Sequence, residues 1–116
     1  MEHYDPKILA KRLLSVSDSL PFETTIRSMM GGYLGFANGQ VFVWLSIGGF
    51  GIKLLPQDQT RLLVRPGTRR MQRLPSHPPS KTYITFSRED LEEDPLLIEW
   101  LTRSGRTAQP SSQRAT

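Results

Sequence analysis

The sequence predicts a two-layer α+β domain, in which helices pack on one antiparallel sheet of about five to six strands. Three patterns indicate this class: an apolar stripe at helical spacing near the start, four short β-type runs separated by glycine turns, and a return to helical spacing in the last third. The chain has 116 residues, 37% apolar and 22% charged, which is typical of one globular domain with a single core.

The domain is assigned to residues 1–105. Residues 106–116 hold no apolar side chain larger than alanine. A segment of this composition has nothing to bury in a core, so we expect a disordered tail.

The first element is a helix that begins at Asp5-Pro6. Aspartate is a favoured N-cap residue, and proline suits the first helical turn. Apolar side chains then recur at helical spacing from Leu9 to Leu20, which predicts one buried stripe. Pro21 is expected to end the helix.

Four β-type runs follow, at residues 24–29, 33–37, 40–47 and 50–55. They are separated by dipeptides that favour the positive φ angles of tight turns, namely Gly31-Gly32, Asn38-Gly39 and Gly48-Gly49. The runs therefore predict an antiparallel meander. Within it, we expect Met29 and Met30 to lie on opposite faces of the sheet with one entering the core, and Trp44 to fill the core.

The second half begins with a helix from Pro56 to a stop at Pro66-Gly67. Two further strand candidates lie at residues 69–74 and 81–86. The proline-rich residues 75–80 between them are expected to be extended and mobile.

A last helical region begins at Ser87, whose hydroxyl suits an N-cap, with Asp90 three residues later. Asp94-Pro95 restarts the helix, and Trp100 falls among its apolar positions. Gly105 is expected to end it.

The stretch RSMMGGYLGF, residues 27–36, is the one that most resembles a ligand loop. Phosphate and dinucleotide loops need a lysine or hydroxyl residue after the glycines, or a following helix. Here Gly31, Gly32 and Gly35 are followed by another strand. The loop is therefore predicted to be a structural turn or bulge.

No catalytic or metal-binding pattern stands out. The chain has no cysteine, which excludes disulfides and thiolate chemistry. His3 and His77 lie far apart without metal-ligand spacing. The acids of residues 89–99 are explained by their place at a helix start. We expect no cofactor, no metal and no enzymatic activity, although an enzyme with an unrecognised site remains an alternative.

The location expected is the cytoplasm. The N-terminal residues are polar and acidic, unlike a signal peptide. The most apolar stretch, residues 41–52, is too short to span a bilayer, so no membrane association is expected.

The charges are strongly segregated. Residues 61–81 contain no acid and six basic residues, Arg61, Arg65, Arg69, Arg70, Arg73 and Lys81. Residues 87–99 contain six acids and a single base. Such a basic segment is either a nucleic-acid contact surface or a partner of the acidic helix and solvent. The sequence leaves both interpretations open.

One family resemblance emerges from these motifs. The stretch RSMMGGYLGFANGQVF, residues 27–42, resembles the signature that opens the TfoX N-terminal domain family. The similarity continues through FGIKLL and through KTYITFSREDLEEDPLLIEWLTRS, and covers about residues 7–104. The matching motif positions are Arg27, Met29, Met30, Gly31, Gly32, Gly39, Lys53 and Trp100.

The resemblance implies helices packed on an antiparallel sheet, and kinship with regulators of competence genes. In these regulators the domain is a non-enzymatic accessory to transcription. The expected function is thus a single-domain regulatory or protein-interaction module with a protein partner. Weak nucleic-acid binding through residues 61–81 is the alternative function. A homodimer is also possible.

Overall fold

The structure is a computed structural model that describes residues 3–72 and 76–110. Within these residues, a six-stranded antiparallel sheet has the strand order β1-β2-β3-β4-β6-β5. The strands are β1 (Thr24–Met29), β2 (Gly32–Ala37), β3 (Gln40–Ser46), β4 (Gly49–Lys53), β5 (Arg69–Arg70) and β6 (Tyr83–Thr85). The helices are α1 (Pro6–Ser17), α2 (Pro56–Leu63), α3 (Arg88–Leu91) and α4 (Asp94–Ala108). The predicted α+β class is confirmed.

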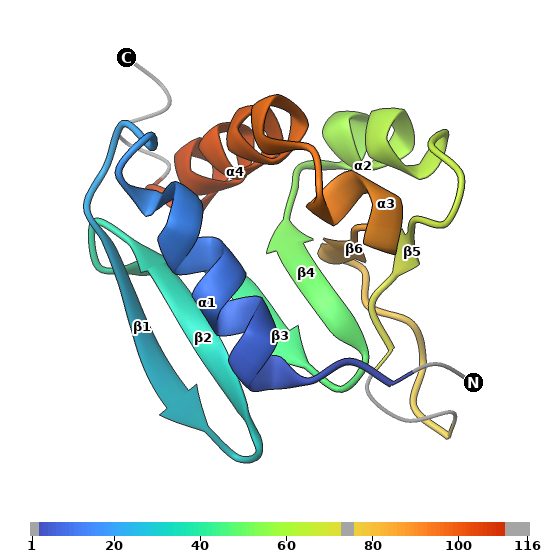
Figure 1. The fold of residues 1–116 in the computed structure, drawn as a ribbon. Coiled ribbons are helices and arrows are strands. Elements are labelled where there is room, and N and C mark those ends of the chain that lie inside the picture. Colours follow the sequence, from blue (N-terminus) through green and yellow to red (C-terminus); the bar gives the residue numbers. More distant parts are fainter. Residues whose placement is uncertain (1–2, 73–75, 111–116) are drawn as a thin grey trace.

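Helices α1 and α4 lie across the same face of the sheet, as Figure 1 shows. The core lies between this face and the helices. Its fully buried side chains come from both layers, and include Leu13, Phe42, Val43, Leu45, Phe50, Ile52, Leu62, Ile84, Leu97 and Leu101.

The first half of the chain follows its local signals closely. The carboxylate of Asp5 accepts a hydrogen bond from the backbone N–H of Lys7 at 3.0 Å, and so caps α1. Strands β1 to β4 form the predicted meander. Its first two turns have positive φ at both central residues, Met30-Gly31 and Asn38-Gly39, as primed hairpin turns require.

The second half has shorter strands than predicted. β5 has two residues and β6 has three, and part of the run 69–74 lies outside the described residues. After Arg70 the buried side chain of Met71 packs on Gly51, on the face of the sheet away from α1 and α4. The hydroxyl of Ser87 accepts a hydrogen bond from the N–H of Asp90, which caps α3 as expected.

The prediction that Gly105 ends the last helix is wrong. Helix α4 continues to Ala108, and Gly105 is buried inside it against the ring of Phe22. The absence of a side chain at Gly105 therefore lets the helix pack closely on that ring. The glycine does not end the helix. The side-chain amide of Gln109 donates to the carbonyl of Ala37 at 3.1 Å, so residues 106–109 belong to the domain. Residues 111–116 of the predicted tail lie outside the described residues.

Two predictions about large side chains in the meander are also wrong. Met29 is 47% exposed and Met30 is 80% exposed, so neither enters the core. Met29 ends β1 on the face away from the helices, and Met30 occupies the turn. Trp44 is half-buried on that same outer face. Trp100, in contrast, lies in the core as predicted.

Candidate binding surface

The second face of the sheet carries a cluster of apolar and basic side chains. Helix-facing residues such as Leu45 and Ile52 are fully buried, and their strand neighbours point to the opposite side. In the part of the chain that the structure describes, no helix packs on that side, and the side chain of Met71 covers it at Gly51. We call its side chains the open face, and define it as Arg27, Leu34, Phe36, Val41, Trp44, Lys53 and Tyr83.

A β-bulge decides which residues reach the open face. The register between β2 and β3 shifts between Gly35 and Phe36, so that Phe42 has no partner in β2. Phe42 and Val43 both turn inward and are fully buried. Trp44 consequently points outward, opposite Leu34 and Gly51.

Three aromatic rings from three strands lie on the open face. The rings of Trp44 and Tyr83 meet edge to face, with centroids 5.9 Å apart and an interplanar angle of 80°. The guanidinium of Arg27 lies over the ring of Phe36, 5.9 Å from its centroid. Burial raises the pKa of Tyr83, so its hydroxyl is uncharged near neutral pH.

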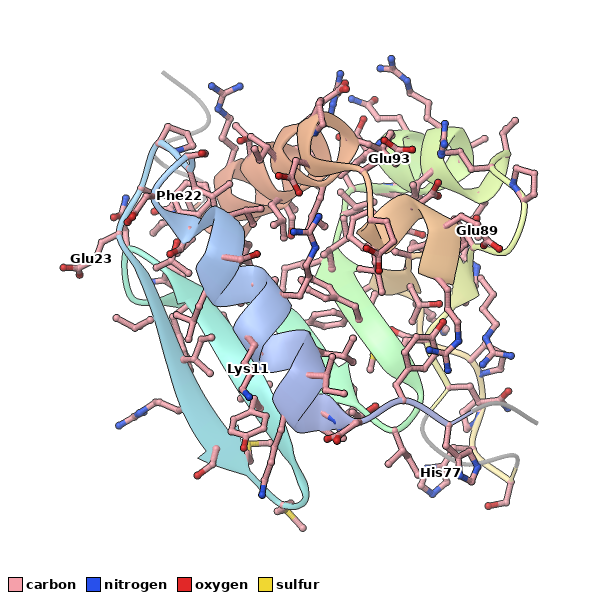
Figure 2. The ribbon with its side chains drawn as sticks, viewed as in Figure 1. Lys11, Phe22, Glu23, His77, Glu89 and Glu93 are labelled. Atoms are coloured by element: carbon pink, nitrogen blue, oxygen red, sulfur yellow. The ribbon has the colours of Figure 1, made fainter. Side chains whose placement is uncertain are left out.

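The sheet carries no negative charge. Residues 24–57 contain no aspartate or glutamate, and neither do β5 and β6. The charged residues of the six strands are all basic, namely Arg27, Lys53, Arg69 and Arg70. Carboxylates such as Glu89, on α3, and Glu93, at the N-cap of α4, lie outside the strands (Figure 2). The open face is therefore aromatic and basic.

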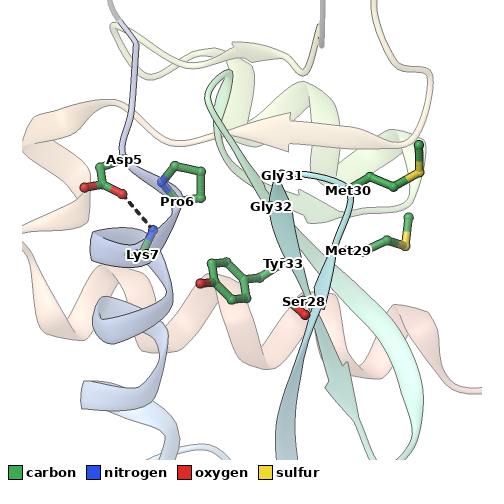
Figure 3. Close-up of a pocket in the computed structure, with 9 residues that line it drawn as sticks. All are labelled: Asp5, Pro6, Lys7, Ser28, Met29, Met30, Gly31, Gly32 and Tyr33. Atoms are coloured by element: carbon green, nitrogen blue, oxygen red, sulfur yellow. Dashed lines mark hydrogen bonds between the residues drawn. The ribbon is translucent and has the colours of Figure 1, made fainter.

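The glycine loop that resembled a ligand site has a structural role. It lines a surface pocket of about 400 Å³ beside the start of α1. Figure 3 shows Tyr33 pointing toward α1, whereas Met29 and Met30 extend to the other side of the hairpin. The one carboxylate in the pocket, that of Asp5, already accepts the capping hydrogen bond. The glycines themselves are accounted for by the turn at Gly31 and by the close approach of Gly32 to the backbone of β3.

The basic segment 61–81 is divided among several structural roles. The guanidinium of Arg65 makes two hydrogen bonds, at 3.0 and 2.8 Å, to the buried carboxylate of Asp90. These hydrogen bonds and the charge of Asp90 raise the pKa of Arg65. Arg70 donates to the side-chain carbonyl of Gln59 at 2.7 Å. Pairing with the acidic helical region is thus confirmed for Arg65.

The other members of the basic segment do not share these roles. Arg61, Arg69 and Lys81 are exposed, on α2, on β5 and just before β6. Arg73 lies outside the described residues. Binding of nucleic acid by this segment stays a prediction. Two of its arginines, Arg65 and Arg70, are exposed but already make intramolecular hydrogen bonds.

The ion pair between Arg65 and Asp90 makes a testable prediction about stability. Replacing Arg65 by alanine leaves a buried carboxylate without its charged partner, and is expected to lower the free energy of unfolding by about 2 kcal/mol. Asp90→Asn is expected to cost less, about 1 kcal/mol, because the amide oxygen still accepts from Arg65. Urea unfolding measures both values. A loss at Asp90→Asn that equals or exceeds the loss at Arg65→Ala would contradict this account.

The motif residues of the family resemblance do not gather at one site. Arg27 and Lys53 share the open face, whereas Trp100 is buried between the layers. Gly39 occupies a turn with φ of 84°. Sequence reasoning missed the open-face residues Leu34, Phe36, Val41, Trp44 and Tyr83, since they come from separate strands.

Other kinds of site find little support in the described part of the chain. His3 and His77 are exposed and distant in sequence. No group of three or more histidine, cysteine or acidic residues is arranged there to hold a metal ion. None of the described helices is long and apolar enough to cross a membrane. Comparison with family models, curated proteins and solved structures found no match for this chain.

Proposed function

We propose that the protein is a non-enzymatic binding module that uses its open face to hold a macromolecular partner. The observation that supports this most is the composition of that face. The residues on the solvent-facing side of an antiparallel sheet are usually polar. Here it presents Leu34, Phe36, Val41, Trp44 and Tyr83, all only half-buried. Apolar side chains grouped on one face are typical of interaction sites.

The chemistry of this face favours binding over catalysis. Its ionisable groups are Arg27, Lys53 and a tyrosine whose pKa is raised by burial. None of them is a nucleophile paired with a general base. The resemblance to the TfoX N-terminal domain supports a regulatory role in the cytoplasm, and we propose such a role, linked to transcription, as the cellular setting.

The alternative, binding of duplex nucleic acid through residues 61–81, has weaker support. Arg65 is held by Asp90 and Arg70 by Gln59. Releasing either guanidinium for a phosphate would break an existing hydrogen bond.

The proposal is tested by photo-crosslinking in cells. A benzophenone amino acid at Phe36 places the reactive group on the open face, and the same residue at Lys11 places it on the exposed side of α1 (Figure 2). We expect covalent adducts with a macromolecule from position 36 and few from position 11. Equal adducts from both positions, or adducts from position 11 alone, would refute the use of the open face.

A further inference from the structure

We infer that the open face binds single-stranded nucleic acid, with bases stacked on Phe36, Trp44 and Tyr83 and phosphates held by Arg27 and Lys53. This inference rests on the proposed function of the open face, and names the chemical class of its ligand.

The aromatic rings suit stacking with bases. They come from β2, β3 and β6, which lie within one continuous sheet in the order β2-β3-β4-β6. With neighbouring strands about 4.8 Å apart, the backbones of these strands extend over roughly 14 Å, and the rings of Trp44 and Tyr83 approach to 5.9 Å between centroids above Gly51. Four-stranded RNA-binding sheets stack two or three bases on a surface of this kind. The aromatic side chains are only half-buried, so part of each remains accessible.

The charges select an anionic ligand. Arg27 and Lys53 are the charged members of the open face, the register places Arg69 on the same side of the sheet, and no carboxylate occurs in any of the six strands. A second copy of the chain docked face to face would bring these cations together without a compensating acid. A protein partner would need acidic groups beside an apolar surface. A single strand combines phosphates with flat apolar bases, and so matches both features.

Duplex nucleic acid fits the open face less well, because its bases are already stacked on one another. Aromatic side chains reach bases only where these are unpaired. Stacking also tolerates any base, so little sequence preference is expected.

The inference is tested by fluorescence anisotropy of the full chain with labelled 12-mers of dT and rU, and with a duplex of equal length. We expect the single strands to bind at least about tenfold more tightly than the duplex. Trp44→Leu and Phe36→Leu keep an apolar side chain but remove a ring, and should each weaken binding at least about fivefold. Thermal melting of each variant establishes that it is folded.

A pair of arginine variants separates the open face from the basic segment. Arg27→Ala should make the log–log dependence of affinity on salt shallower by about 0.7, the value for one phosphate of a single strand. Arg61→Ala removes an equally exposed arginine on α2 and should leave the dependence unchanged. The reverse result, or equal affinity for the duplex, would assign binding to residues 61–81 and overturn the inference.

Intrinsic fluorescence gives an independent measurement. In Trp100→Phe the remaining tryptophan is Trp44, and oligo-dT should quench it. In Trp44→Leu the remaining tryptophan is Trp100, which is 7% exposed in the core and should respond little.

Two further outcomes would overturn the inference that the ligand is nucleic acid but would still support the open face as a binding surface. One is the absence of oligonucleotide binding together with self-association that Trp44→Leu abolishes. The other is a set of adducts at position 36 whose size is unchanged by nuclease treatment. Absence of position-specific adducts in cells would instead count against the proposed function as a whole.

Discussion

Replacing Gly32 by valine is expected to lower the free energy of unfolding by about 3 kcal/mol, near the upper end of over-packing penalties. A Cβ atom at this position would overlap the backbone carbonyl oxygen of Leu45 in β3. That oxygen belongs to the paired strand and cannot move aside without disturbing the ladder between β2 and β3. Urea or thermal unfolding of the variant measures the loss.

Gly31 provides the matched control. It has φ of 84°, and no atom lies within 4 Å of the place a Cβ would take. Gly31→Ala is therefore expected to cost only the backbone strain of a left-handed residue, about 1 kcal/mol. Equal losses of stability in Gly32→Val and Gly31→Ala would show that Gly32 is not needed for the close approach of β2 to Leu45. The prediction that the Gly31-Gly32 dipeptide supplies the positive φ angles of the turn holds for Gly31 only, because the second residue with positive φ is Met30 and not Gly32.

The second large effect is expected at Gly105. A side chain added there would overlap the ring of Phe22, which packs edge to face on Phe42 with centroids 5.3 Å apart. Gly105→Leu is expected to lower the free energy of unfolding by about 2 to 3 kcal/mol, because the ring must leave its place against the core. Figure 2 shows Phe22 beside α4.

Two variants establish the cause. Arg106→Leu adds the same side chain at the exposed neighbouring position, and should change stability by less than about 0.5 kcal/mol. Phe22→Ala in the Gly105→Leu background makes room for the leucine, so the double variant should be more stable than the two separate losses added together. Additive losses, measured by urea unfolding, would show that the two residues do not compete for space.

The elements of this fold follow from local signals in the chain. Asp5 and Ser87 supply side-chain caps, and Pro6, Pro56 and Pro95 occupy first turns. The turn at Asn38-Gly39 needs positive φ angles, which asparagine and glycine adopt readily. Each signal acts between residues a few positions apart, so the order of helices and strands in the first half could be predicted.

The ends and faces of the elements depend on distant residues. Glycine is a common helix stop, but α4 continues past Gly105, which lies against the ring of Phe22, far away in sequence. Arg65 is engaged rather than free because Asp90 lies beside it in the folded chain. Neither partner is indicated by spacing or composition.

The open face shows the same division. The residue types of the meander, aromatic and basic without acids, can be read from the sequence. Which of them face solvent cannot, because strict alternation would put Trp44 on the same face as Phe42. The bulge opposite Gly35 reverses that relation, so that Phe42 enters the core and Trp44 joins Phe36 and Tyr83 outside. The position of a bulge depends on how two strands align their registers while burying apolar side chains. It is therefore a property of the assembled sheet and not of one strand.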